Sequence, residues 1–162
     1  MIKKITLISI TALALMGCGG SDSSEAVSTK VTDIAGLEGF WNTSYDKDGK
    51  HDELYEVFLA NGEITLYDYQ GDTFDNGADC YLIGRSRVEI RQNVAGVFYF
   101  YDLKEEKEGL KFDAEISTDA LTIIDAFEPN KKLVYPKVTK TLAEIEAKRC
   151  PSSNKAVFKK RR

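Results

Sequence analysis

The chain has 162 residues and carries 26 acidic against 22 basic side chains, which gives a formal net charge of −4 at pH 7. This length corresponds to one domain and is enough to bury an apolar core. A net acidic chain argues against nucleic acid as a partner, because binding to phosphate backbones requires an excess of basic side chains.

The N-terminal residues have the three zones of a secretory signal peptide. Lys3 and Lys4 are followed by an apolar stretch, residues 5–16, and then by Gly17 and Cys18. The apolar stretch is too short for a spanning helix, which needs about 20 residues. We therefore predict that residues 1–17 are a signal peptide that is removed on export.

Residues 15–18, with the sequence Leu-Met-Gly-Cys, resemble the lipobox of bacterial lipoproteins, in which the cysteine becomes lipid-modified. The resemblance implies two or three acyl chains on Cys18, enough to anchor the protein to a membrane. An ordinary signal peptide with a chance cysteine is the alternative. Gly19 stands where an aspartate is associated with inner-membrane retention, so the resemblance implies a bacterial cell-envelope protein on the outer membrane, facing the periplasm.

Small and polar residues follow Cys18, and globular character begins near Ile34. Residues 18–33 have the composition of a flexible tether, and residues 34–150 form the predicted domain. Residues 151–162 form a tail with a basic end, residues 159–162. We predict a solvated tail, with contact to anionic lipid as the alternative.

Cys80 and Cys150 remain once Cys18 is assigned to lipid. An exported chain lives where disulfides persist, and an even number of remaining cysteines fits a structural bridge. The alternatives are a reactive thiol or a metal site, but no histidine is near either cysteine in the sequence and no Cys-x-x-Cys spacing occurs. We therefore predict a Cys80–Cys150 disulfide, which would stabilise the domain by about 4 kcal/mol in the chain-entropy model.

Strand patterns dominate the domain, because apolar, β-branched and aromatic residues alternate with polar ones between short turns. Asn61 and Gly62 are the strongest hairpin signal, and Thr141 with Glu144 matches a capping box that starts a short helix ending near Arg149. The expected strands are residues 40–45, 54–60, 63–69, 80–84, 87–91, 97–103, 110–116, 121–127 and 133–138.

These elements predict a mostly β fold, an antiparallel meander with a short C-terminal helix. Such a sheet removes its exposed edges most simply by closing into a small barrel of about eight strands, and a sandwich is the alternative.

Gly39, Phe40 and Trp41 open the first long strand after an apolar entry segment, residues 34–37. This resembles the Gly-x-Trp motif of lipocalins, in which the tryptophan plugs one end of an eight-stranded barrel. The Cys80–Cys150 pair and the helix before Cys150 are similar to the disulfide and terminal helix of that family. The resemblance implies a lipocalin-like barrel over residues 34–150.

The match to lipocalins departs from the family pattern at two places. Thr118 and Asp119 match part of a Thr-Asp-Tyr motif, but Ala120 replaces the tyrosine. The arginine that stacks on the family's tryptophan has no arginine counterpart, so Lys137 or Lys140 would have to serve. The expected strands are shorter than those of a roomy ligand cup, which favours a barrel filled by its own side chains over one that encloses a ligand.

Several residues could form a site, but each has a simpler interpretation. Tyr99 and Tyr101 could line a ligand pocket, although packing and surface exposure explain them better. Tyr67 and Tyr69 carry the same ambiguity. The carboxylates of residues 72–79 could bind Ca²⁺, but their spacing does not match an EF-hand and a solvated turn is favoured.

Catalysis has little support in the sequence. His51 is the only histidine, and it stands in a polar stretch beside two acidic residues. No Gly-x-Ser-x-Gly elbow, zinc spacing or phosphate-binding loop occurs. We predict a non-enzymatic module with no cofactor, metal or catalytic residue, held at the membrane by acyl chains on Cys18.

The predicted role is binding of a small apolar ligand by residues that the sequence does not identify. The alternative is a protein-interaction module, such as a hydrolase inhibitor or an envelope-assembly factor, that uses loops such as residues 71–79.

Overall fold

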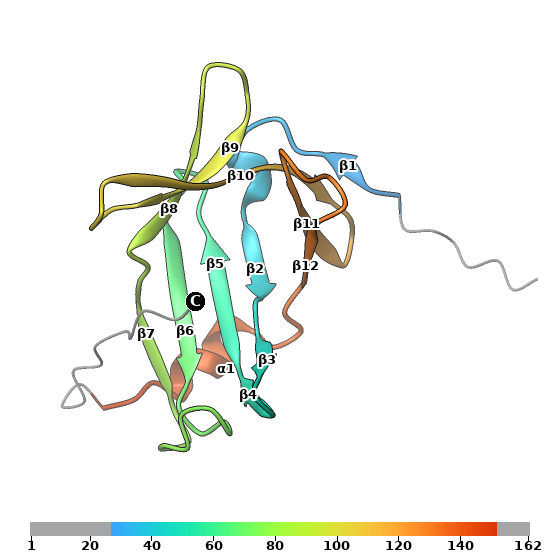
Figure 1. The fold of residues 1–162 in the computed structure, drawn as a ribbon. Helices are drawn as coiled ribbons and strands as arrows, with labels where there is room; N and C mark the ends of the chain where they lie inside the picture. The colour runs from blue at the N-terminus through green and yellow to red at the C-terminus, as the bar shows by residue number, and fades with distance from the viewer. Residues whose placement is uncertain (1–26, 152–162) are drawn as a thin grey trace, which may run out of the picture.

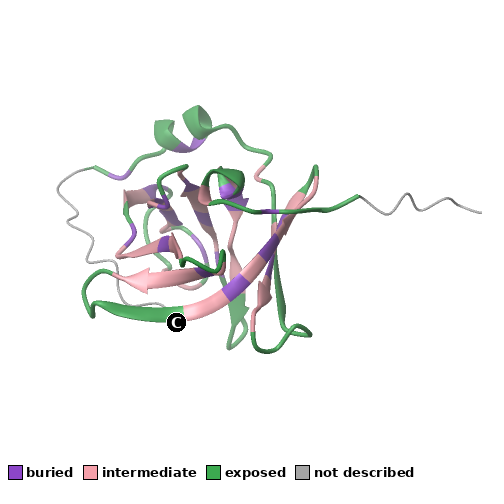
Figure 2. Cartoon of the chain, turned by 90° about the horizontal axis from the view of Figure 1, so that it is seen from above, coloured by how far each residue is buried: buried purple, intermediate pink, exposed green. Residues whose placement is uncertain are grey.

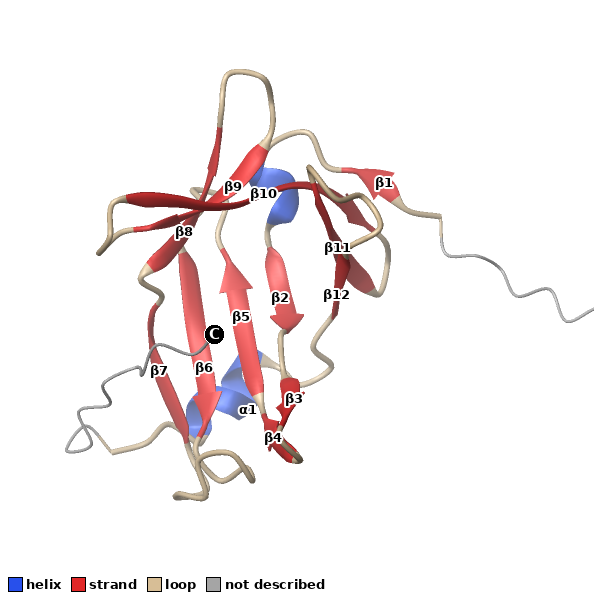
Figure 3. Cartoon of the chain, in the orientation of Figure 1, coloured by secondary structure: helices blue, strands red, loops and turns tan. Residues whose placement is uncertain are grey.

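The computed structural model describes residues 27–151, so the predicted signal peptide, Cys18 and the basic tail lie outside the described residues. The described elements are strands joined by turns, with two short helices (Figure 3). In chain order they are β1 (Thr29–Lys30), η1 (Ile34–Leu37), β2 (Gly39–Asn42), β3 (Tyr45–Lys47), β4 (Lys50–Asp52), β5 (Leu54–Phe58), β6 (Ile64–Tyr69), β7 (Tyr81–Arg85), β8 (Val88–Gln92), β9 (Phe98–Asp102), β10 (Lys107–Ile116), β11 (Ala120–Asp125), β12 (Lys132–Pro136) and α1 (Leu142–Ala147).

The strands pair antiparallel in three sheets (Figure 1). A four-stranded sheet has the order β2-β5-β6-β7, and a six-stranded sheet has the order β12-β11-β10-β9-β8 with β1 added on β10. Strands β3 and β4 form a separate hairpin. The mostly β, antiparallel architecture with a short C-terminal helix is confirmed, but the described strands do not form one closed barrel.

The turn between β5 and β6 forms as Asn61 and Gly62 predict. Gly62 has a φ of +86°, a conformation that side chains rarely adopt. A Cβ at this position would also overlap the carbonyl oxygen of Ile90. The hairpin turn is therefore a place where strand β8 approaches the four-stranded sheet closely, and only glycine fits between them.

The core lies between the two larger sheets. Its buried members are aliphatic and aromatic side chains from both sheets, and buried positions follow the strands in the view from above (Figure 2). Trp41 is 2% exposed and donates a hydrogen bond from Nε1 to the carbonyl of Leu37 at 3.2 Å. Gly39 lies against the Trp41 indole, where a Cβ would overlap the ring, so the Gly-x-Trp spacing has a steric reason. The main buried residues of this core are Leu37, Trp41, Phe58, Ile64, Ile90, Phe98, Phe112, Leu121 and Ile123.

Helix α1 covers the opposite face of the four-stranded sheet. Ile145 of the helix packs with Tyr55, Tyr67 and Tyr81 in a second apolar cluster. Thr141 caps the helix in a capping box with Glu144, as predicted. The helix and the segment around it therefore bury aromatic rings that would otherwise lie on the surface of the sheet.

The Cys80–Cys150 disulfide is confirmed, with 4.9 Å between the two Cα atoms. It joins the start of β7 to the end of the segment that carries α1. The backbones of Tyr81 and Arg149 form a parallel bridge beside it, and Cys150 donates its N–H to the carbonyl of Tyr81 at 2.9 Å. The disulfide thus reinforces a short stretch of strand pairing at the edge of the sheet.

Two segments are more regular than expected. Residues 29–30, within the predicted tether, form β1 on β10, and Val31 is buried with its N–H bonded to the carbonyl of Ala114. Residues 45–52 form the β3–β4 hairpin, whose turn uses the positive φ values of Asp48 and Gly49. The packed part of the described chain therefore begins at Thr29. The β3–β4 hairpin also places His51 in strand β4.

Candidate functional site

Glu56 lies on the inner face of the four-stranded sheet, toward the core. Alternate residues of β5 face opposite sides, so Glu56 shares a face with Phe58, which belongs to the main core. In the strand register, Glu56 is directly opposite Trp41 of β2 and Leu66 of β6. Both of these neighbours pack in the core, so an acidic side chain stands among apolar ones.

The environment of Glu56 favours its neutral form. Burial raises the pKa of Glu56 to about 7. Burial also raises the pKa of Tyr135, on β12 of the other large sheet, to about 12, and the charge of Glu56 contributes to this shift. Within residues 27–151 the Glu56 carboxyl makes no hydrogen bond or ion pair, although the residue keeps part of its solvent exposure. The carboxyl is therefore placed between two sheets with its hydrogen-bonding capacity still available.

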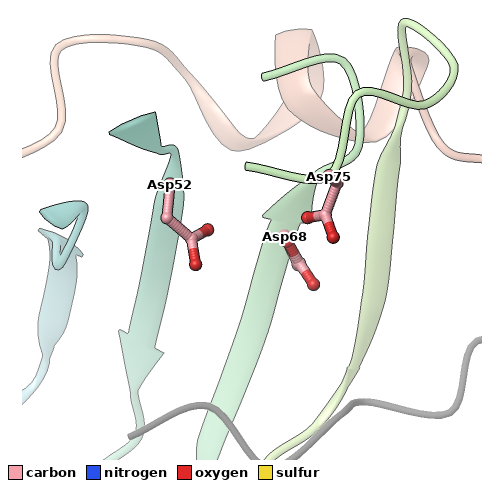
Figure 4. Close-up of side chains that lie close together, drawn as sticks. All are labelled: Asp52, Asp68 and Asp75. Atoms are coloured by element: carbon pink, nitrogen blue, oxygen red, sulfur yellow. The ribbon is translucent and has the colours of Figure 1, made fainter. Parts of the chain in front are cut away.

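Three aspartates meet beyond Glu56, at the end of the sheet that carries the β3–β4 hairpin. Asp52 ends β4, Asp68 lies on β6 and Asp75 comes from the loop of residues 70–80 (Figure 4). A carboxylate oxygen from each lies within 4.8 Å of the others, and Asp52 and Asp68 are buried. Asp68 pairs in register with Leu54, so it is the diagonal neighbour of Glu56 on the same face.

Three ionised carboxylates at this spacing would repel one another by roughly 3 kcal/mol per pair at an effective dielectric constant of about 20. A bound cation would relieve that repulsion. Asp52, Asp68 and Asp75 are therefore the described residues that could supply oxygen ligands to a metal ion. The prediction that the protein binds no metal stays a prediction.

The loop that supplies Asp75 is anchored, which differs from the solvated turn expected for residues 72–79. Asp72 is 8% exposed and accepts hydrogen bonds from the backbone N–H groups of Glu53, Phe74 and Asp75 at 2.8–3.0 Å. The Phe74 ring contacts the Tyr45 ring with 6.3 Å between centroids. These contacts fix the loop against β3 and β4, so Asp75 is carried to the other two aspartates.

A second polar group lies on the outer face of the four-stranded sheet. Lys140 Nζ donates to Glu53 Oε1 at 2.9 Å and lies 3.1 and 3.2 Å from the hydroxyl oxygens of Tyr55 and Tyr81. Both tyrosine hydroxyls also donate to Glu53. The Lys140 ammonium, the two tyrosine hydroxyls and Glu53 Oε1 thus bond to one another, and these contacts hold the segment before α1 on the sheet.

The pKa shifts agree with this structural role. Burial alone would raise the pKa of Glu53, but hydrogen bonds from Tyr81, Lys140 and Tyr55 hold it below its usual value. Burial and the hydrogen bond to Glu53 raise the pKa of Tyr81 well above its usual value. Burial would lower the pKa of Lys140, but its bonds to Glu53, Tyr55 and Tyr81 raise it. The ion pair therefore stays charged across the physiological pH range.

Other residues that the sequence singles out are dispersed. Tyr99 and Tyr101 alternate with the core residues Phe98 and Phe100, and the Arg91 guanidinium stacks 3.5 Å from the centre of the Tyr101 ring. The packing interpretation of this strand is therefore the better one.

His51 is half exposed, and its Nδ1 lies 2.8 Å from Asp46. Tyr67 is buried under α1, and Tyr69 donates to the exposed Asp79 at 2.7 Å. Of the two lysines considered as the partner of Trp41, Lys137 forms a backbone bridge with it and Lys140 lies in the outer polar group.

Sequence reasoning missed Glu56, although a signal was present. In residues 54–58, Leu-Tyr-Glu-Val-Phe, alternate residues of a strand face the same side, so the glutamate lies on the same face as Leu54 and Phe58. Tyr55 and Val57 are also apolar, however, so the pattern does not reveal which face is the inner one. The meeting of Asp52, Asp68 and Asp75 depends on strand register and loop docking, which local sequence does not specify.

No helix within residues 27–151 has both the length and the apolar character needed to cross a membrane. Comparison with known proteins found no matching family model, no matching curated protein and no matching solved structure.

Proposed function

We propose that the protein is a lipid-anchored lipoprotein of the bacterial cell envelope whose β domain binds a small, largely apolar ligand on the inner face of the four-stranded sheet. The observation that carries the proposal is Glu56, a partly exposed glutamate on the inner face, directly opposite Trp41 and Leu66 in the strand register, whose carboxyl makes no hydrogen bond or ion pair among residues 27–151. A structural glutamate at such a place would normally be paired, because an unpaired buried charge is costly.

The surroundings of Glu56 also support a ligand site. Leu54, Leu66 and Leu82 share its face of the sheet, and each keeps part of its solvent exposure. The opposite end of the inner face is filled by core side chains such as Phe58 and Ile64. The proposed site is therefore the part of the inner face where Leu54, Leu66 and Leu82 stay partly exposed, next to the three aspartates.

A barrel-like arrangement of the two large sheets is part of the proposal. At one seam, Ser86 and Ile90 donate backbone hydrogen bonds to the carbonyls of Ile64 and Gly62, both at 2.8 Å. At the other seam, Val138 donates to the carbonyl of Phe40 at 3.0 Å. These contacts support sheets that curve around a shared interior, as in the lipocalins that the Gly-x-Trp segment resembles.

The membrane anchor in this proposal is Cys18, with no catalytic role for the domain. The 11 residues from Cys18 to Thr29 span at most about 40 Å when fully extended. The acyl chains on Cys18 would therefore keep Thr29, where the packed domain begins, within about 40 Å of the bilayer. Gly19 supports the outer membrane, facing the periplasm, as the location.

Trp41 allows a direct test, because it is the only tryptophan in the chain and is opposite Glu56. The purified full chain is titrated with 1-octanol, a small neutral amphiphile, while the fluorescence of Trp41 is recorded. We expect a saturable change in emission. A linear change without saturation, or none, would overturn binding at the inner face.

Protein interaction is the second candidate function, and exposed apolar side chains favour it. Leu133 and Val134 on the edge strand β12 are 47% and 58% exposed, and Phe127 in the preceding turn is 78% exposed. Retention of a protein partner by the wild-type chain, lost when Phe127 and Val134 are both changed to Ser, would support this candidate.

A further inference from the structure

The charge around the proposed site restricts which ligand it can hold. Glu56 and Asp68 are diagonal neighbours on one face of adjoining strands, and Asp52 and Asp75 gather around Asp68. This end of the face thus carries the carboxyl groups of Glu56 and Asp68, and those of Asp52 and Asp75 lie beside Asp68. An anionic head group would be repelled there, and a neutral one would leave an ionised Glu56 without a counter-charge.

We propose that the ligand is a small amphiphile with an ammonium head, which donates a hydrogen bond to Glu56, and an apolar tail that packs on the inner face. This inference rests on the proposed function and names the ligand class of the same site. The geometry offers each part of such a molecule a matching surface: the Glu56 carboxylate for the head, and the partly exposed Leu54, Leu66 and Leu82 on the same face for the tail.

An aromatic ring near the carboxyl strengthens the choice of a cation. Tyr135 keeps part of its solvent exposure and lies close enough to Glu56 to feel its charge. A cation near a ring face gains a further attraction, which a neutral head lacks. The ammonium group would also supply the positive charge that keeps Glu56 ionised, so binding of the head and ionisation of Glu56 favour each other.

The test compares probes that differ only in the head group. The purified full chain is titrated at pH 8 with n-octylammonium, 1-octanol and octanoate, with calorimetry and the fluorescence of Trp41 as the two measurements. The variant is Glu56→Gln, which keeps the size of the side chain and removes its charge. The control is Glu106→Gln, the same change at an exposed residue in the turn between β9 and β10.

We expect octylammonium to bind at least tenfold more tightly than octanol, and octanoate to bind most weakly. Glu56→Gln should reduce the octylammonium affinity at least tenfold and leave the octanol affinity within twofold, and Glu106→Gln should change neither. Circular dichroism of both variants checks that they are folded.

Equal affinities for octylammonium and octanol in wild-type protein would overturn the ammonium inference and leave the proposed function standing. An unchanged octylammonium affinity in folded Glu56→Gln would also overturn the inference. Absence of saturable binding for all three probes would overturn the proposed function as well.

Discussion

Replacing Glu56 with Gln should stabilise the protein at alkaline pH and not at acidic pH. The pKa of Glu56 is raised to about 7 in the folded protein from an ordinary value of 4.5. The folded state therefore binds a proton more tightly than the unfolded state. The stabilising effect of this proton is complete below pH 4.5 and is lost as the pH rises through 7.

The magnitude follows from the size of this shift. A shift of about 2.5 pKa units corresponds to roughly 3 kcal/mol, because each unit is about 1.4 kcal/mol. Glu56 keeps part of its solvent exposure, so we reduce the expected effect to about 1–2 kcal/mol. Glu56→Gln should thus be close to wild type at pH 4 and more stable by about 1–2 kcal/mol at pH 8.

Urea unfolding of the full chain, followed by the fluorescence of Trp41 and by circular dichroism, measures this difference at pH 4, 6 and 8. Glu106→Gln is the matched control and should track wild type at every pH. If Glu56→Gln were less stable than wild type at pH 8, the carboxylate would have a favourable partner and the reasoning about an unpaired inner glutamate would be refuted.

Three further predictions concern the rest of the molecule. Reduction of the Cys80–Cys150 disulfide should lower the free energy of unfolding by about 4 kcal/mol, because it closes a loop of 70 residues; a thermal melt unchanged by reductant would contradict this. Lys140→Met should lower the free energy of unfolding by about 1–3 kcal/mol at pH 7. It should also raise the pKa of Glu53, because the hydrogen bond from Lys140 helps to lower that pKa. Titration of the Glu53 carboxyl by NMR measures this effect, and an unchanged pKa would count against the network. Cys18→Ser should move the protein from the membrane to the soluble fraction when produced in its own host; continued membrane attachment would argue against the lipid anchor.

Local chemistry explains which parts of the fold were predictable. Alternating apolar residues located the long strands, Asn61 and Gly62 located one hairpin, and Thr141 with Glu144 located the helix start. The Cys80–Cys150 pairing followed from counting the cysteines that remain once Cys18 is assigned to a predicted lipid anchor. Each of these features depends on neighbouring residues or on a small number of pairings.

The features that escaped prediction depend on contacts between distant segments. Strand β1 is only two residues long and exists because β10 offers it a partner. The inner orientation of Glu56 is set by which face of β5 meets the six-stranded sheet, and both faces of β5 carry apolar residues. Asp75 reaches Asp68 only because Asp72 and Phe74 fix the intervening loop.

Native mass spectrometry of the full chain purified from its own host tests the central claim most directly. We predict a lipid-modified protein that carries one non-covalently bound small molecule, and we predict that Glu56→Gln, purified in the same way, loses this molecule while Glu106→Gln retains it. Repeated recovery of the wild-type protein with no bound molecule, or equal retention by Glu56→Gln, would contradict the claim that Glu56 and the inner face of the four-stranded sheet form a ligand site.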